Sequence, residues 1–246
     1  MNVNKYYLLI ILSFVFSQLA PALIAPLLLT MGFEGNETEL FATAIAYSMT
    51  IGFILAVLFS SLAGRDPQFD GKRADTGKTI LWSFIGIFLA FAGQYAASLI
   101  QMLAFGIEPG SENTEMIVGF STAVPFMIFV VAILVPVTEE LVFRKVIFGA
   151  IYKRTGFWIA AIVSGLIFGA LHGDFENILV YLAMGVVFSY LYVKTGRIIV
   201  PIIAHVGINS FVMLVQVVFG DRLLELIDQL EEMEQSIQAL MGVFLS

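Results

Sequence analysis

Long apolar segments constrain the fold of this chain more than any other feature. They cover approximately residues 6–31, 40–63, 79–105, 116–138, 141–152, 157–172, 177–193 and 198–219. Several exceed the roughly 18 residues that a helix needs to cross a bilayer. Lipid offers no partner to backbone groups, so such segments must be helical unless they close into a barrel, and they lack the alternation of barrel strands. The sequence therefore predicts an all-α, polytopic transmembrane helical bundle with about 7–8 membrane helices.

Composition supports this class and excludes several functions. The 246 residues are 59% hydrophobic and 13% charged, whereas soluble domains average about 45–50% and 25%. Cysteine is absent, which excludes thiolate nucleophiles, thiolate metal sites and disulfides. The net charge of −7 argues against a nucleic-acid partner. We expect a single transmembrane domain over residues 1–220.

Charged connections predict how the helices cross the membrane. The connection 64–78 carries four basic residues, whereas 32–39 and 106–115 carry only acids. By the positive-inside rule the first is cytoplasmic and the other two face outward. Two further basic turns, at 153–154 and 194–197, fit the same alternation. The sequence predicts a multi-pass protein of a bacterial cell membrane with a cytoplasmic N-terminus.

The tail, residues 221–246, has a different pattern. Apolar residues recur at steps of three and four with acids between them, which predicts an amphipathic helix. They are Leu223, Leu226, Ile227, Leu230, Met233, Ile237, Leu240 and Met241. Such a helix could lie on the protein or membrane surface, or make a short coiled-coil contact with a partner. The sequence leaves both possibilities open.

Six polar residues interrupt the apolar second half. A charge at the bilayer centre costs about 3 kcal/mol, so ionisable groups there suggest a function by default. The six are Glu139, Glu140, Arg144, His172, His205 and Asn209, and they include both histidines of the chain.

Spacing predicts that these residues meet. Glu140 and Arg144 stand four apart in the order that favours an ion pair, while Glu139 points about 100° away and is left free. Glu139 and His172 are equally far from the centre of the basic turn at 153–156, so neighbouring helices place them at one height. The depths of His205 and Asn209 are compatible with the same layer.

Two chemistries suit such a layer. Glu139 beside His172 could activate a water, while His205 and Asn209 donate hydrogen bonds to a developing oxyanion. Alternatively, His172, His205 and Glu139 could hold Zn²⁺ with one position left for water. Either route hydrolyses a carbonyl compound, most naturally a peptide bond in or near the membrane.

Other hydrolytic sites fit less well. The zinc-binding HExxH pattern is absent, and Asp174 is the single aspartate of the second-half membrane region. Ser164 precedes His172 by eight residues, about 12 Å along one helix, and is more simply a small residue at a helix contact. Ser210 could also pair with either histidine, and the sequence does not exclude this alternative.

Three motifs resemble a known family. "EELVFR" at 139–144, "FGALH" at 168–172 and "HVGIN" at 205–209 resemble the motifs EExxxR, FxxxH and HxxxN of the CAAX-protease and bacteriocin-processing (CPBP) family, also called Abi. The resemblance covers about residues 116–219, which would be the catalytic core. One departure is Lys145, where glycine is common in the family.

The resemblance implies a helical-bundle peptidase, often labelled a metalloprotease, with a site inside the membrane that opens toward the cytosol. Glu139 and His172 would activate water, and Glu140 and Arg144 would support them. His205 and Asn209 would stabilise the oxyanion.

We therefore expect an intramembrane endopeptidase that hydrolyses a membrane-associated or prenylated peptide or protein. A non-proteolytic scaffold, acting in immunity or regulation, is the alternative. A proton-coupled transporter is less favoured. Transporters often consist of two repeated halves, and this sequence shows no such internal repeat. Besides substrate and lipid, a partner could bind the tail helix.

Overall fold

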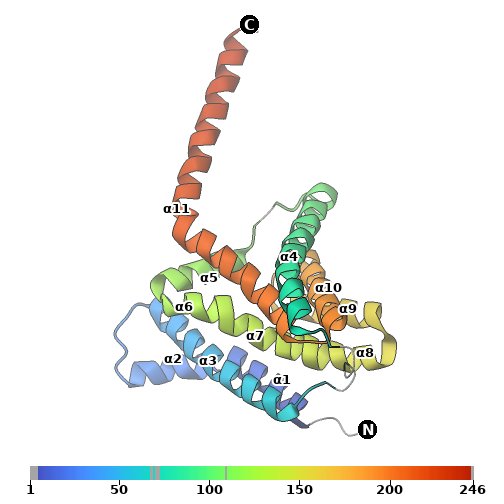
Figure 1. The fold of residues 1–246 in the computed structure, drawn as a ribbon. Helices are drawn as coiled ribbons and strands as arrows, with labels where there is room; N and C mark the ends of the chain where they lie inside the picture. Colours follow the sequence, from blue (N-terminus) through green and yellow to red (C-terminus); the bar gives the residue numbers. More distant parts are fainter. Residues whose placement is uncertain (1–4, 67–68, 70–72, 109, 245–246) are drawn as a thin grey trace.

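The computed structural model describes residues 5–66, 69, 73–108 and 110–244, and all regular elements within them are helices (Figure 1). Most are α-helices; the two labelled η are π-helices. Their bounds are α1 Lys5–Leu19, α2 Pro21–Thr30, α3 Glu37–Ala63, α4 Thr76–Phe105, α5 Glu112–Ala123, α6 Phe126–Phe129, η2 Val130–Leu134, α7 Val135–Glu139, η3 Glu140–Phe148, α8 Gly149–Thr155, α9 Phe157–Leu171, α10 Ile178–Thr195 and α11 Ile199–Phe244. The predicted all-α bundle is confirmed.

The number of membrane helices is lower than expected. In the described part of the chain, five helices are long and apolar enough to cross a membrane. A sixth span is possible if α1 and α2, which are bent by 51° relative to each other, count as one. The five are α3, α4, the continuous run Phe126–Thr155, α10 and the first part of α11, Ile199–Val217. The chain is polytopic, and its described residues contain five to six such spans, whereas 7–8 were expected.

One expected span, 157–172, is replaced by α9, which with 15 residues is too short to be counted, and a second difference arises around the acidic pair. Two spans, 116–138 and 141–152, were expected on either side of it. Instead the chain breaks earlier, at Val124–Pro125, and then continues as one helix from Phe126 to Thr155. The acids do not end this helix because both are buried and their carboxylates contact side chains of other helices or the next turn.

This central helix is partly π-helical. Segments η2 and η3 lie on either side of α7, which begins with Pro136 at its second position. A π-helix bonds residue i to i+5 and turns less per residue than an α-helix, and such segments often occur at functional sites. Glu139 is the last residue of α7, and Glu140 and Arg144 lie in η3.

Helices α9 and α10 form a closely packed pair that carries one side of the site. A Cβ atom added to Gly185 would lie 2.7 Å from the Cα of Gly165, so the two backbones touch there. Small residues permit this approach. No hydrophobic driving force acts between helices in a membrane, and close packing stabilises their contact instead. The contact fixes the end of α9, where His172 follows Leu171.

The tail is helical and continues α11 without a break to Phe244, extending beyond the bundle (Figure 1). Leu230, Met233 and Ile237 expose 60, 55 and 51% of their surface. The side chains of the remaining expected apolar residues lie outside the described part: Leu223, Leu226, Ile227, Leu240 and Met241. A partner or membrane contact of this helix stays a prediction.

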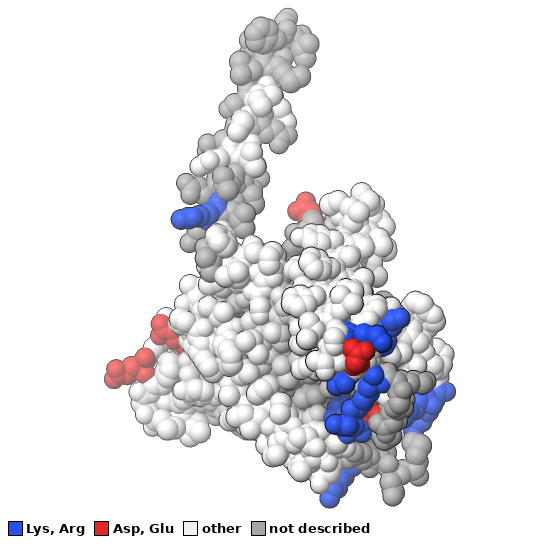
Figure 2. All heavy atoms as spheres, viewed as in Figure 1, with Lys and Arg blue, Asp and Glu red and all other residues white. Residues whose placement is uncertain are grey.

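Basic side chains gather at one end of the bundle, near α8 and the start of α4 (Figure 2). Lys153 there forms an ion pair of 3.2 Å with the buried Asp66. The connection 64–78 and the turns at 153–154 and 194–197 thus meet in space, although Lys72 lies outside the described residues. That this end faces the cytoplasm stays a prediction.

Candidate active site

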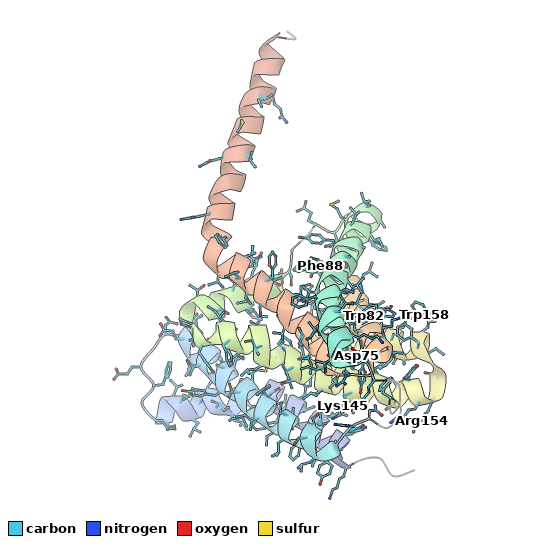
Figure 3. All side chains as sticks on the ribbon, viewed as in Figure 1. Asp75, Trp82, Phe88, Lys145, Arg154 and Trp158 are labelled. Atoms are coloured by element: carbon cyan, nitrogen blue, oxygen red, sulfur yellow. The ribbon has the colours of Figure 1, made fainter. Side chains whose placement is uncertain are left out.

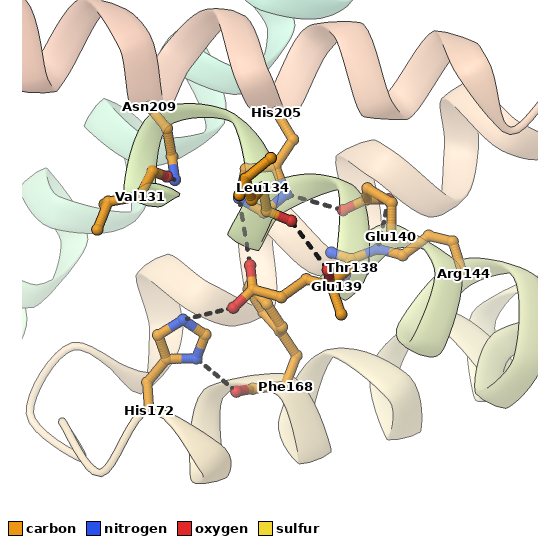
Figure 4. Close-up of polar contacts among 10 residues, drawn as sticks. All are labelled: Val131, Leu134, Thr138, Glu139, Glu140, Arg144, Phe168, His172, His205 and Asn209. Atoms are coloured by element: carbon orange, nitrogen blue, oxygen red, sulfur yellow. Dashed lines mark hydrogen bonds and ion pairs between the residues drawn. The ribbon is translucent and has the colours of Figure 1, made fainter. Parts of the chain in front are cut away.

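Glu139, the last residue of α7, is the centre of a cluster that joins three helices (Figure 4). Its Oε1 lies 3.7 Å from Nε2 of His172, and its Oε2 lies 3.7 Å from Nε2 of His205. Only 6% of Glu139 is exposed. The expectation that Glu139, His172 and His205 share one layer is confirmed.

In both histidines the ring nitrogen farther from Glu139 is Nδ1, and a hydrogen bond at this atom fixes the orientation of the imidazole ring. Nδ1 of His172 lies 2.8 Å from the carbonyl oxygen of Phe168, which can only accept, so this nitrogen carries the hydrogen. Nδ1 of His205 lies 2.9 Å from Oε1 of Glu140. Each ring therefore turns its Nε2 toward Glu139, the orientation that a partner at Nδ1 typically sets in hydrolytic sites.

Glu140 and Arg144 form the expected ion pair, and both are fully buried. Arg144 Nε lies 3.4 Å from Glu140 Oε2, and neither side chain exposes more than 1%. None of the guanidinium nitrogens has a hydrogen-bond partner among the described residues. Instead the guanidinium lies over the rings of Phe168 and Phe188, 4.7 and 5.1 Å from their centroids. Cation–π attraction thus stabilises a charge that the apolar interior would otherwise disfavour.

Two aromatic residues of α10 complete the cluster and were not predicted. Phe188 stacks on His205 with centroids 4.6 Å apart, and Tyr181 stacks on His172 at 4.3 Å. They stand seven residues apart, which puts them on one helix face. This spacing was a usable signal, but aromatic pairs at helical spacing are common in any apolar helix.

Asn209 is less closely joined to the cluster. Its Nδ2 donates to the carbonyl oxygen of Val131 in η2, at a long 3.5 Å. No hydrogen bond joins Asn209 to Glu139 or to either histidine within the described residues. Its expected part in stabilising an oxyanion stays a prediction.

The serines considered from the sequence lie apart from this chemistry. Ser164 is buried and donates to the carbonyl oxygen of Phe143 at 2.9 Å, so its hydroxyl holds α9 against η3. Ser210, on α11, makes no contact with either histidine in the part of the chain that the structure describes. Asp174 accepts hydrogen bonds from Ser111, at 2.7 Å, and from Asn177, away from Glu139.

The zinc alternative can be tested against ligand geometry. Two ligands of a tetrahedral zinc ion stand about 3.4 Å apart. Both nitrogen–oxygen separations at Glu139 are wider, at 3.7 Å, and they involve opposite oxygens of the carboxylate. Among the described residues, no group of three or more His, Asp or Glu side chains is placed to hold a metal ion. As arranged, Glu139, His172 and His205 do not fit the geometry of a zinc site. Whether cleavage requires a metal is tested by the metal analysis described below.

Comparison with known proteins agrees with the site. A family model described as type II CAAX prenyl endopeptidase Rce1-like matches residues 121–211, which include all six polar residues of the apolar second half. No solved structure gives a significant match.

Three relatives extend the similarity beyond this segment. The putative membrane peptidase YdiL of Bacillus subtilis is 37% identical over 219 residues, 87% of this chain and 90% of the relative. The membrane-embedded CAAX protease MroQ of Staphylococcus aureus is 34% identical over 233 residues, 90% of this chain and 93% of the relative. The UPF0177 protein YxdF of Lactococcus lactis is 27% identical over 164 residues, 65% of this chain and 86% of the relative.

These similarities run through most of the chain, and they coincide with a buried carboxylate–histidine cluster inside a polytopic bundle. The chain therefore belongs to the Rce1-like CAAX protease family and is an intramembrane endopeptidase.

Proposed function

We propose that this endopeptidase is glutamate-dependent, with Glu139 as the general base that activates a water molecule. The observation that supports this most directly is the position of the Glu139 carboxylate between the Nε2 atoms of His172 and His205, 3.7 Å from each. These separations are too long for direct hydrogen bonds. A water placed within about 2.8 Å of both Glu139 and His172 spans such a gap.

The proton positions follow from the partners at Nδ1. With its hydrogen on Nδ1, neutral His172 offers a lone pair at Nε2. The water then donates one hydrogen to His172 and the other to Glu139, and its oxygen lone pair is free to attack a carbonyl carbon. Glu139 takes the proton as the C–O bond forms. The same proton passes to the amide nitrogen as the C–N bond breaks, which leaves a free amine and a carboxylic acid that keeps the second proton of the water.

His205 has a different role because two carboxylates flank it, Glu140 at 2.9 Å and Glu139 at 3.7 Å. Its Nδ1 faces Glu140 and its Nε2 faces Glu139. Once Glu139 has taken the proton of water, the Nε2–H of His205 is available to the oxyanion of the tetrahedral intermediate. Two acidic side chains, Glu139 and Glu140, and two basic ones, Arg144 and His205, thus share the buried cluster.

The substrate class proposed is a membrane-associated or prenylated peptide. Glu139 and His205 are buried, whereas the side chain of His172 is 20% exposed. A peptide bond would thus reach the cluster from the side of His172. The names of the relatives matched by this chain, CAAX protease and prenyl endopeptidase, point to substrates held at the membrane.

The experiment compares purified wild-type protein with Glu139→Gln in detergent, on a library of membrane-anchored peptides with and without a prenyl group. Loss of general-base catalysis costs about 10²–10⁴-fold, so we expect cleavage to fall below detection in Glu139→Gln. Glu112→Gln, a matched change of an exposed glutamate in α5, should cleave like wild type. Full activity in Glu139→Gln would exclude the proposed base.

Metal analysis and chelation of the same samples distinguish the two mechanisms. Cleavage that persists in metal-free protein supports the glutamate route. Cleavage that chelation abolishes and Zn²⁺ restores would assign the water activation to a metal instead. Unchanged thermal unfolding of Glu139→Gln confirms that the variant is folded.

A further inference from the structure

A second polar site lies at the basic end of the bundle, apart from the Glu139 cluster. It is a cavity of about 450 Å³ between the end of α3, the segment that follows it, η3, the end of α10 and the start of α11. This volume lies within the roughly 300–1,000 Å³ typical of ligand sites. Among the described residues, one carboxylate lines it, that of Asp66, together with four cationic side chains: Arg65, Arg73, Lys145 and Arg197.

Lys145 brings a nearly buried charge to this cavity. Only 6% of the residue is exposed, and its Nζ donates to the carbonyl and hydroxyl oxygens of Ser60, at 2.9 and 2.7 Å. Both of these partners are neutral. The carboxylate of Asp66 forms its ion pair with Lys153, at 3.2 Å. No ion pair of Lys145 occurs within the described residues, although Asp66 is near enough to attract its charge.

Arg73 adds one buried donor without a partner among the described residues. Its Nε is buried and makes no hydrogen bond within the described part of the chain. A buried donor without a partner is costly, and such a group suggests that another molecule accepts its hydrogen bond. Arg197, on the same wall, donates its Nε–H to the carbonyl oxygen of Ala74, which fixes the segment beside Arg73. The planar guanidinium of Arg73 is suited to bidentate contact with phosphate oxygens.

We propose that this cavity binds a phosphate group, supplied either by the headgroup of an anionic phospholipid or by a free phosphate ion. Four cations against one carboxylate, among the lining residues that the structure describes, favour an anion, and the arginine donors favour a tetrahedral oxyanion. The cavity lies among helix ends at the most basic face of the molecule (Figures 2 and 3). Basic pockets between transmembrane helices on the cytoplasmic side are where anionic headgroups bind. This site is independent of peptide hydrolysis.

Native mass spectrometry of the purified full-length chain in neutral detergent tests the proposal. Phosphatidylglycerol supplies the lipid source, phosphatidylcholine is the zwitterionic reference, and inorganic phosphate is the competitor. We expect the wild type to retain phosphatidylglycerol in preference to phosphatidylcholine. Arg73→Gln and Arg65→Gln each remove one cation from the cavity wall, and each should weaken retention about tenfold.

Lys194→Gln is the matched control. It removes one charge from the same end of the molecule, but Lys194 lies over the Trp82 ring and does not line the cavity. Its retention of lipid should equal that of the wild type. Displacement of phosphatidylglycerol by inorganic phosphate would show that the phosphate group alone is recognised, and retention despite phosphate would assign the site to the lipid.

Two results would overturn the proposal. One is equal retention of phosphatidylglycerol and phosphatidylcholine by the wild type together with no binding of inorganic phosphate. The other is an equal loss in Arg73→Gln and Lys194→Gln, which would indicate general surface charge in place of a site. Thermal unfolding of each variant confirms that lost binding does not come from unfolding.

Discussion

At the scale of single residues, the buried charges of the site depend on one another. Glu140 contacts Arg144 on its own helix and His205 on α11, and the guanidinium rests on two phenylalanine rings. Removal of one charge leaves its partner buried without compensation, whereas removal of both leaves an apolar interior. Arg144 therefore contributes to stability through Glu140 and needs no contact with substrate.

Arg144→Met should accordingly lower the free energy of unfolding by about 3–5 kcal/mol, because the buried Glu140 loses its ion pair and keeps only His205 as a partner. The double variant Glu140→Gln/Arg144→Met should recover much of this loss, although it removes the carboxylate that orients His205. Thermal unfolding in detergent, followed by circular dichroism, measures both. A single variant as stable as the wild type would contradict the interdependence.

Tyr181 allows the position of His172 to be tested without touching the polar cluster. Its ring stacks on His172 at 4.3 Å, and its hydroxyl lies 3.4 Å from Oδ2 of Asp174. Tyr181→Phe keeps the stack, so we expect cleavage within about threefold of wild type. Tyr181→Leu removes the flat surface and should lower kcat by about tenfold or more, since small displacements of a catalytic group are costly. Equal kcat values for the two variants would exclude a positioning role.

The residues of the site could be predicted from the sequence because charged groups are so costly in an apolar helix. Glu139, Glu140, Arg144, His172 and His205 form the cluster expected from their spacing. Phe188 and Tyr181 could not be singled out, because an aromatic ring in such a helix is equally suited to lipid, core or site. Which histidine nitrogen faces Glu139 also depends on tertiary contacts that no spacing encodes.

At the scale of the elements, the helical character was predictable but the boundaries around the site were not. The polar pair Glu139–Glu140 suggested a break, yet the central helix passes through it. Two features decide this: partners on other helices for the carboxylates, and π-helical turns that depend on packing more than on local sequence. Neither is visible until the helices are placed together.

The contact of α9 with α10 provides a prediction at this scale. A Cβ atom on Gly185 would lie 2.7 Å from the Cα of Gly165, a backbone atom that cannot move aside. Gly185→Ala should push the two helices apart, with a cost of about 1–3 kcal/mol in stability and a loss of cleavage as His172 shifts. Thermal unfolding and cleavage assays measure the two effects.

Gly119→Ala is the matched control for this substitution. Gly119 lies within α5 and has no heavy atom within 4 Å of the added Cβ. Alanine has the higher helix propensity, so stability should stay the same or rise by up to about 1 kcal/mol. A Gly185→Ala protein that behaves like Gly119→Ala would show that the close approach of α9 and α10 is not required.

At the scale of the whole molecule, the distribution of charge predicts its orientation. Basic residues gather at one end of the bundle, whereas the connections 32–39 and 106–115 carry acids alone (Figure 2). Because cytoplasmic connections carry the excess of Lys and Arg, we expect the basic end and the N-terminus in the cytoplasm. The phosphate cavity would then face the leaflet in which anionic headgroups meet basic pockets.

The absence of cysteine allows this orientation to be measured, since each introduced cysteine is a unique reporter. Glu37→Cys and Glu112→Cys place one on each acidic connection, and Lys78→Cys and Arg154→Cys place one on each of two basic connections. A membrane-impermeant maleimide should label the first two in intact cells. It should label the second two only after permeabilisation, because they face the cytoplasm. Labelling of Lys78→Cys from outside would reverse the orientation and place the basic cavity on the opposite leaflet.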